Sequence, residues 1–248
     1  MVNVNEFKEF AEFVLNKAGM GSYLTPDEFN LNAYRAIMEF TMKRYGNQQE
    51  YQPGRPIPRV SYEKTQKIID DLRHLKEVQL IDVTSGSVLI PDGTTVQNSI
   101  GNIIPEYLHL STLTYTKITN SDCTNGPEVR KKSVDIVKDD ELAMRCDSEL
   151  VPPTLDYPIG NIQSDYIRLY PQSISQVEMV YLRQPNKPVW GFTVVSNRFV
   201  YDAATSTDLD IPKEAFNEVV MMFLSYMGMR IREPQVVQYA EMQKNQGV

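Results

Sequence analysis

One stretch of the chain, residues 212–227, is apolar around most of a predicted helix. It contains the longest uninterrupted apolar run of the sequence, Val219–Leu224, and Gly228 is expected to end it. Its apolar side chains cover more than half of the helix circumference: Ala215, Phe216, Val219, Val220, Phe223, Leu224 and Met227. Such a helix is buried on most sides or lies at a contact between subunits. The acidic segment Ser206–Asp210 is expected to cap its start.

Helices are also predicted in the N-terminal third of the chain. Apolar residues recur at helical spacing over residues 3–18, and again over residues 25–46 after the capping sequence Thr25-Pro-Asp-Glu. A third helix is expected to start at Ser61. The proline-rich residues 48–60 between them are expected to be extended, because proline disfavours helix at the residue before it.

From residue 77 the pattern changes to short apolar runs separated by turn residues. Ser85-Gly86 and Asp92-Gly93 are hairpin turn signals, and residues 165–170 and 176–183 alternate like a pair of adjacent strands. A further hairpin is predicted over residues 190–201, around Ser196-Asn197.

Two more helices are predicted, and they complete the order of helices and strands along the chain. Residues 139–146 predict a short helix that begins with an acidic cluster, and Glu233-Pro234 predicts the start of a last helix to about Lys244. Helices at both ends and strands in the middle predict an α+β fold. We expect one elaborated domain with a helical part at 1–76, a β-rich part at 77–205, and C-terminal helices at 206–248 that pack back on the N-terminal helices.

Charge and cysteine content narrow the class of protein. The formal net charge of −7 argues against a chain whose main task is clamping duplex DNA. Cys123 and Cys146 are too far apart to suggest a disulfide framework. The chain shows no signal peptide and no apolar run of the length that a membrane span needs, so we expect a soluble protein made in the cytoplasm.

Motifs for chemistry are absent from the sequence. It contains no nucleotide-binding glycine loop, no HExxH and no GxSxG, and its only histidines are His74 and His109. We therefore expect no enzyme, no catalytic residue, no metal ligand and no cofactor. Two alternatives stay open. A hydrolase would need one of the histidines beside a carboxylate or nucleophile, and a carbohydrate-binding or adhesive module would need Trp190 exposed among tyrosines.

A set of short segments, mostly towards the two ends of the chain, is characteristic when taken together. The segments are GSYLTPDEFN at 21–30, KRYG at 43–46, LYP at 169–171, MVYLRQP at 179–185, PVW at 188–190, STDLDIP at 206–212 and EPQVVQY at 233–239. This set resembles the ring or adaptor proteins of the head-to-tail connector (neck) of tailed bacteriophages, and most of all those of crAss-like phages.

The resemblance implies a virion structural protein, made in the host cytoplasm, that forms part of the genome-ejection channel between portal and tail. It implies a homo-oligomeric ring, expected to be a dodecamer, with the portal protein and neighbouring neck or tail proteins as partners. Genomic DNA would pass without specific binding, and no membrane would be involved. The alternative within the virion is another tail or head component.

A ring also makes a physical demand on its subunit. Rings close through heterologous contacts, so two different faces of each subunit must bind a neighbour. The interface residues expected from the sequence are Phe216, Val220, Phe223, Trp190 and Tyr239.

Overall fold

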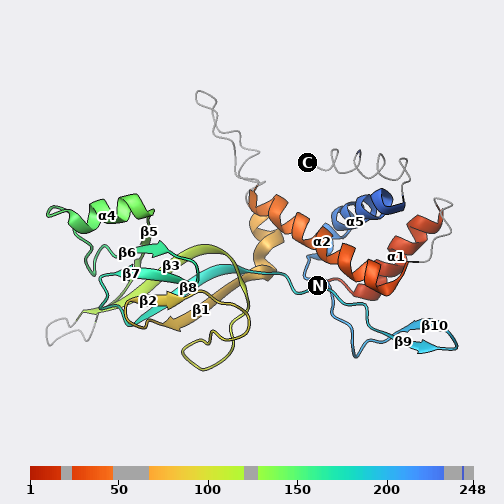
Figure 1. Cartoon of the computed structure of the whole chain (residues 1–248), viewed down its shortest axis with the longest axis horizontal. Coiled ribbons are helices and arrows are strands. Elements are labelled where there is room, and N and C mark those ends of the chain that lie inside the picture. Colours follow the sequence, from red (N-terminus) through yellow and green to blue (C-terminus); the bar gives the residue numbers. More distant parts are fainter. Residues whose placement is uncertain (18–23, 47–66, 120–127, 232–241, 243–248) are drawn as a thin grey trace. The chain divides into compact units, whose positions relative to one another are not determined.

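The computed structural model describes residues 1–17, 24–46, 67–119, 128–231 and residue 242 (Figure 1). The predicted α+β class is confirmed, with helices towards both ends of the chain and β-sheets in the middle. The chain divides into two compact units. Unit 1 comprises Met1–Leu75 and Pro185–Val248, and unit 2 comprises Lys76–Gln184.

This division differs from the single elaborated domain with parts 1–76, 77–205 and 206–248. The first change of structure falls within one residue of the expected boundary, but residues 185–205 group with the helices of unit 1. The reason is strand pairing. Lys76 and Leu182 lie opposite each other on neighbouring antiparallel strands, so the chain enters and leaves unit 2 side by side.

The helices of unit 1 begin where local capping groups predict. Helix α1 (Val4–Lys17) follows Asn3, whose side-chain oxygen accepts the backbone N–H groups of Asn5 and Glu6 at 2.9 and 3.2 Å. Helix α2 (Pro26–Gly46) follows Thr25, whose hydroxyl oxygen accepts the N–H of Glu28 at 3.4 Å. Both predicted helices are confirmed. Residues 67–72 are also helical and continue into the 3-10 turn η1 (Arg73–Leu75).

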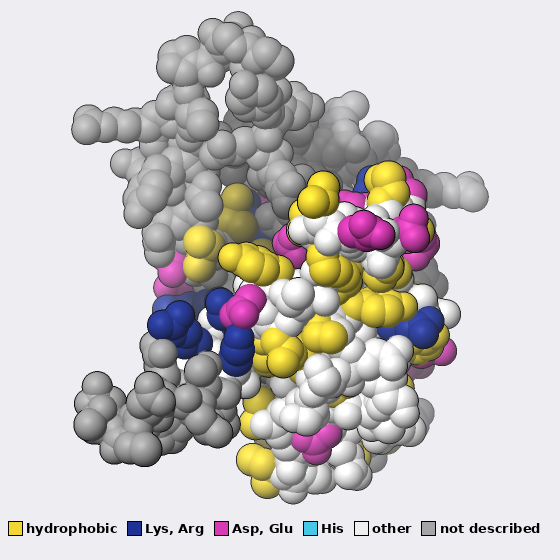
Figure 2. Space-filling model, turned by 90° about the vertical axis from the view of Figure 1, so that its left-hand side faces the viewer, with side chains coloured by type: hydrophobic (Ala, Val, Ile, Leu, Met, Phe, Trp, Pro, Cys, Tyr) yellow, Lys and Arg dark blue, Asp and Glu magenta, His cyan; other side chains and the backbone are white. Residues whose placement is uncertain are grey.

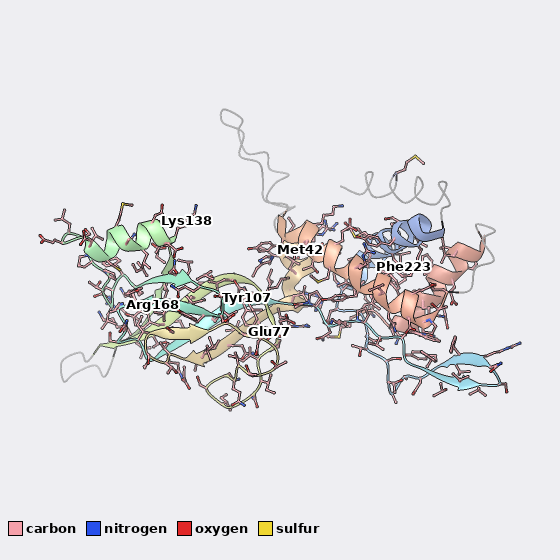
Figure 3. All side chains as sticks on the ribbon, viewed as in Figure 1. Met42, Glu77, Tyr107, Lys138, Arg168 and Phe223 are labelled. Atoms are coloured by element: carbon pink, nitrogen blue, oxygen red, sulfur yellow. The ribbon has the colours of Figure 1, made fainter. Side chains whose placement is uncertain are left out.

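The apolar C-terminal helix is buried by its own chain. A 3-10 turn, η2 (Lys213–Ala215), leads into α5 (Phe216–Ile231), which packs against α2 and α1. Three phenylalanine rings from the three helices, Phe7, Phe29 and Phe223, meet at centroid distances of 5.5–6.0 Å. Figure 3 shows Phe223 among the helices of unit 1. Helix α5 is therefore buried on most sides, which is the first of the two placements expected from the sequence.

Two details of the expected helix are wrong. The helix continues through Gly228 to Ile231, although a glycine inside a helix costs about 1 kcal/mol relative to alanine. The acidic segment before it does not cap it either. Asp208 accepts the N–H of Val4 at 3.0 Å and so caps α1, while Asp210 accepts the N–H of Asn186 at 3.0 Å. The segment Ser206–Asp210 therefore stabilises the start of α1 and the backbone at Asn186, and not the helix that follows it in sequence.

A buried ion cluster ties three helical segments of unit 1 together. Arg44 near the end of α2 pairs with Asp71 of residues 67–72 (Nε–Oδ2, 2.9 Å) and with Glu218 of α5. Lys43 lies 3.3 Å from the same glutamate. Burial raises the pKa of the Asp71 carboxyl, and the charge of Arg44 opposes that rise. The cluster is therefore a site where loss of one charge leaves another buried without compensation.

Unit 2 contains two four-stranded sheets. The first has the order β1-β8-β3-β4 and is antiparallel throughout; the second has the order β2-β7-β6-β5 and is antiparallel except for the parallel pair β5–β6. The strands are β1 (Lys76–Asp82), β2 (Ser87–Leu89), β3 (Tyr107–Thr119), β4 (Glu128–Ser133), β5 (Asp135–Ile136), β6 (Ile159–Ile162), β7 (Tyr166–Tyr170) and β8 (Gln176–Arg183). Helix α4 (Asp139–Asp147), which confirms the short helix expected at 139–146, contacts β6.

One core lies between these sheets. Ile167 and Leu169 of β7 face it from the second sheet, and Val177, Met179 and Tyr181 of β8 face it from the first. The alternation in both segments is confirmed, but their expected mutual pairing is wrong. Two alternating strands that are adjacent in sequence have the same pattern whether they pair edge to edge or face each other across a core.

The two turn signals near the start of unit 2 behave differently. Ser85 and Gly86 have φ values of 52° and 73°, and Thr84 and Ser87 exchange backbone hydrogen bonds of 3.0 Å, so the predicted tight turn is confirmed. Asp92-Gly93 does not join paired strands. The Asp92 carboxylate instead accepts the hydroxyl of Thr95 and three backbone N–H groups, from Thr94, Thr95 and Val96. These hydrogen bonds, that of the Thr95 hydroxyl most of all, hold the pKa of Asp92 far below the usual range.

Three sequence predictions fall outside the described residues. They are the proline-rich stretch at 48–60, the start of the helix at Ser61, and the last helix at 233–244 apart from residue 242. Residues 151–158, which contain Pro152, Pro153 and Pro158, are described and form neither helix nor strand. Among the residues that the structure describes, no helix is both long and apolar enough to cross a lipid bilayer.

Candidate interaction surface

A two-stranded hairpin in unit 1 has an unusual composition for its exposure. Strands β9 (Phe192–Val195) and β10 (Arg198–Tyr201) pair with each other and form a sheet of their own. The two-residue turn between them, Ser196-Asn197, has φ values of 50° and 60°, as a type I′ turn requires. The hairpin predicted from the sequence over residues 190–201 is therefore confirmed.

Both faces of this hairpin carry exposed apolar side chains. In the antiparallel register Val194 lies opposite Phe199 on one face, and Thr193 lies opposite Val200 on the other. Val194 is 60% exposed and Val200 is 46% exposed, and both phenylalanines, Phe192 and Phe199, are also exposed. A surface strand usually buries one face and solvates the other, so apolar residues on both faces indicate a surface built for contact with another molecule.

The base of the hairpin is fixed to the helices by Trp190. Its backbone N–H donates to the side-chain oxygen of Asn30 on α2 at 2.7 Å, and its indole N–H donates to that of Asn5 on α1 at 3.0 Å. The indole ring stacks on Phe192 at 6.1 Å and lies 6.0 Å from Tyr201. These contacts run continuously from the core of unit 1 into the hairpin.

Further contacts brace the same region. The Nζ atom of Lys8 on α1 lies 4.2 Å from the centroid of the Trp190 ring, a cation–π contact. The N–H of Asp202 donates to the carbonyl of Gly191 at 2.9 Å, and the N–H of Gly191 donates to the hydroxyl of Ser206 at 3.0 Å. An isolated hairpin is only marginally stable in water, so this anchorage is what holds the strands in place.

No protein-family model matches the chain, and no curated protein is a significant match to it. The function must therefore be argued from the surface itself.

Three of the five interface residues expected from the sequence are buried. Val220 and Phe223 are fully buried in the core of unit 1, and Phe216 is partly buried against Phe7 and Phe10. Trp190 is only 5% exposed, and Tyr239 lies outside the described residues. Of these residues, Val220, Phe223 and Trp190 present no surface for a neighbouring subunit. Their apolar character follows from packing within unit 1.

The residues that the sequence argument missed are Val194, Val195, Phe199 and Val200. Their apolar character resembles that of a core strand, and the hairpin was predicted without a role. The useful signal was the combination of apolar residues at consecutive positions with a two-residue turn. A short hairpin of that composition has too few strands to bury both of its faces.

Groups able to perform chemistry are sparse in the described part of the molecule. Within the described ranges, no group of three or more His, Cys, Asp or Glu side chains could hold a metal ion. Burial lowers the pKa of His109. Cys146 is an exposed free thiol on α4. The buried position of Trp190 does not provide the exposed aromatic platform that a carbohydrate-binding module would need.

Proposed function

We propose that this chain is a structural subunit of the head-to-tail connector of a tailed bacteriophage, a ring or adaptor between portal and tail. The proposal combines the resemblance carried by residues 21–46, 169–190 and 206–239 with one structural observation. That observation is the anchored β9–β10 hairpin, which is apolar on both faces. A subunit that works by assembly needs a surface of this kind.

In the proposed ring the hairpin is the arm that contacts the neighbouring copy. Heterologous contacts use two different surfaces of each subunit, and a projecting apolar arm is a suitable donor surface for one of them. No strand of the described residues pairs with the outer edges of β9 and β10, so an arm of this kind can also add its backbone to a neighbouring sheet.

The same proposal covers location and partners. The protein acts in the virion neck, contacts the portal and neighbouring neck or tail proteins, and performs no catalysis. Its net charge of −7 suits a channel wall past which DNA moves without being held.

Copy number in purified particles tests the proposal directly. Quantitative mass spectrometry should find this chain at a level close to that of the portal protein. Many more copies per particle would favour a head-decoration role, and absence from particles would refute a virion role altogether.

A hairpin variant tests the arm. Replacing Val194 and Val200 by serine removes one apolar side chain from each face, while the turn and the aromatic anchor stay intact. The matched control is Val78→Ser, which changes a comparably exposed strand valine in unit 2. When supplied during infection, the double variant should enter particles about thirtyfold less than wild type, because each of the two lost apolar contacts weakens docking by about 1 kcal/mol. Equal incorporation of variant and control would contradict the role of the hairpin.

A further inference from the structure

The strand pairing of unit 2 leaves one gap. Strand β8 pairs with β3 along residues 107–114, whereas β4 pairs with β3 only from Thr114 to Thr119. Among the strands that the structure describes, none pairs with the second edge of residues 108–112. An unpaired edge of this kind is a template to which another strand can add.

The gap widens into a hollow because two strands diverge from one contact. The N–H of Val134 donates to the carbonyl of Leu113 at 2.8 Å, and beyond this point the chain leaves β3 and pairs with β6 as strand β5. The hollow between the diverging strands, here called the wedge, has a volume of about 370 Å³. Its lining residues are Leu110, Ser111, Thr112, Leu113, Ser133, Val134, Ile136 and Ile162.

The wedge is an open side of the core of unit 2. A Cβ atom at Gly160 of β6 would lie 3.1 Å from Cδ1 of Ile136 and 3.3 Å from Cδ2 of Leu169, so Ile136 lies beside a core leucine. Ile162 is two residues further along β6 and shares the face of Gly160. Both isoleucines are nevertheless exposed, Ile136 by 39% and Ile162 by 43%. Side chains on the core face that are so open to water indicate that cover is missing here.

The lining of the wedge is uncharged, and its rim is acidic. Asp135 stands between the lining residues Val134 and Ile136, and its side chain is 72% exposed. The guanidinium of Arg145 is shared, at 3.4 Å from Asp135 and 2.6 Å from Glu141, so it offsets only one of the two carboxylates. Figure 2 views unit 2 from the end that carries α4 and shows hydrophobic side chains gathered next to a group of acidic ones.

The hairpin arm of unit 1 has the complementary design. Val194 lies opposite Phe199 on one face of the arm, and Arg198 lies opposite Val195 on the other face. Arg198 is the only charged residue in 192–200, and it forms no ion pair with a described residue. An apolar face backed by one available cation matches an apolar wedge with an acidic rim.

We propose that the arm of one copy of this chain docks in the wedge of a neighbouring copy. Strand β9 adds to the free edge of β3, Val194 enters the wedge, and Arg198 of β10 lies outside it beside Asp135. The side-chain directions agree with this arrangement. Asp135 alternates with Ile136 along β5, so it points away from the wedge, and Arg198 alternates with Phe199 along β10 in the same way.

Charge and symmetry both favour a second copy as the occupant. A nucleic acid or an anionic membrane is recognised by basic side chains, and the wedge has an uncharged lining and an acidic rim. In the proposed contact each copy gives an arm from unit 1 and receives an arm in unit 2. Such a contact is heterologous, as the closure of a ring requires. This inference rests on the proposed role of the arm and adds the surface that receives it.

Disulfide trapping between two single-cysteine chains tests the contact. Both chains are full length and carry Cys123→Ser and Cys146→Ser, so each has one thiol and no cross-link can form within a chain. The arm chain carries Thr193→Cys and an affinity tag, so that the mixed dimer differs in size from either homodimer. The wedge chain carries Thr112→Cys. The matched control is Thr116→Cys, at an exposed threonine of the same strand where β4 already pairs with the edge.

The two cysteine positions follow from the faces of the strands. Thr112 lies opposite Val180 of β8, which alternates with the core residue Met179, so Thr112 faces away from the core. Thr193 lies on the face of the arm opposite to Val194. With Val194 in the wedge, both threonines point outward from neighbouring strands. Residues facing each other on such strands have Cα atoms about 4.5–5.5 Å apart, which a disulfide can span.

The rate of mixed-dimer formation under mild oxidation is the measurement. The Thr193→Cys chain should react with the Thr112→Cys chain at least about tenfold faster than with the Thr116→Cys control, because docking raises the effective concentration of the two thiols. Adding Val194→Asp to the arm chain should lower the rate to that of the control, because a charge cannot enter the apolar wedge.

A charge exchange tests the rim. Arg198→Glu in the arm chain, or Asp135→Arg in the wedge chain, should each slow trapping about fivefold, because like charges then meet. The two substitutions together should restore the rate, because opposite charges meet again.

Three outcomes would overturn the inference: equal trapping at Thr112 and Thr116, trapping that persists with Val194→Asp, or a charge exchange that fails to restore the rate. The connector role fails separately, through absence of the chain from particles. Control-level trapping by a chain that is present in particles at portal-like copy number would refute this inference alone. Specific trapping by a chain that is absent from particles would refute the connector role alone.

Discussion

Trp190 offers the sharpest test of the assignment of core and surface. The sequence placed it among interface residues, whereas the structure buries it between α1, α2 and the hairpin. The two placements predict different results for Trp190→Ala. A core tryptophan must stabilise the isolated chain, and an interface tryptophan need not.

The expected loss follows from the contacts. Truncating a buried tryptophan to alanine costs about 3–5 kcal/mol in unfolding free energy, since the cavity it leaves is only partly filled by relaxation. The lost indole hydrogen bond adds little, because Asn5 is only half-buried and its side-chain oxygen can accept from water instead. Phe192 and Tyr201 also lose the ring on which they pack, so the hairpin should loosen before the helices unfold.

Denaturant unfolding followed by far-ultraviolet circular dichroism measures the loss. Trp190→Phe is the matched variant, because it keeps a stacked ring and loses the indole hydrogen bond and part of the volume, at about 1–2 kcal/mol. Trp190 is also the single tryptophan of the chain, so wild-type fluorescence should be that of a buried indole and shift to the red on unfolding. An alanine variant that is as stable as wild type but fails to assemble would refute the core assignment and restore the interface hypothesis.

Two further substitutions probe unit 1. Arg44→Met should lower the unfolding free energy by about 3 kcal/mol, because it leaves the buried Asp71 carboxylate without its main counter-charge. Burial already raises the pKa of the Asp71 carboxyl in the folded chain. The folded state therefore binds the proton of this carboxyl more tightly than the unfolded state does. The stability that protonation contributes is lost as pH rises through the folded pKa. The loss of unfolding free energy in Arg44→Met, relative to wild type, should therefore shrink as pH falls from about 7 to about 4. Denaturant titrations at the two pH values measure it. A loss that grows on acidification would contradict this account. Phe223→Asp places a charge among the buried rings of Phe7 and Phe29 and should therefore unfold unit 1. The expected result is a loss of the helical circular dichroism signal, or insoluble protein. A folded, soluble variant would show that this face of the helix is exposed.

Local signals were read correctly where the stabilising partners lie within a few residues. The start of α2 depends on Thr25 and Glu28, which are three residues apart, and the Ser196-Asn197 turn depends on its own backbone angles. Alternation in β7 and β8 also follows from adjacent residues. Such features are present in any chain that contains the segment, which is why sequence patterns identify them.

Partners distant in sequence changed the interpretation elsewhere. Asp208 was expected to cap the following helix, but it accepts the N–H of Val4, 204 residues away. Strands β7 and β8 were expected to pair, but they lie in opposite sheets of one core. In both cases the local pattern is compatible with two arrangements, and the choice depends on which distant segment packs alongside.

The amino-acid pattern was sufficient for the α+β class, for most helix and hairpin positions, and for the order of helices around a β-rich middle. It could not separate core from contact surface. Phe223 and Val194 are both apolar, yet one is enclosed by α1 and α2 while the other is 60% exposed on a two-stranded hairpin. Hydrophobicity records only that a side chain gains by leaving water, and the packing of distant segments decides whether its own chain or another molecule provides the cover.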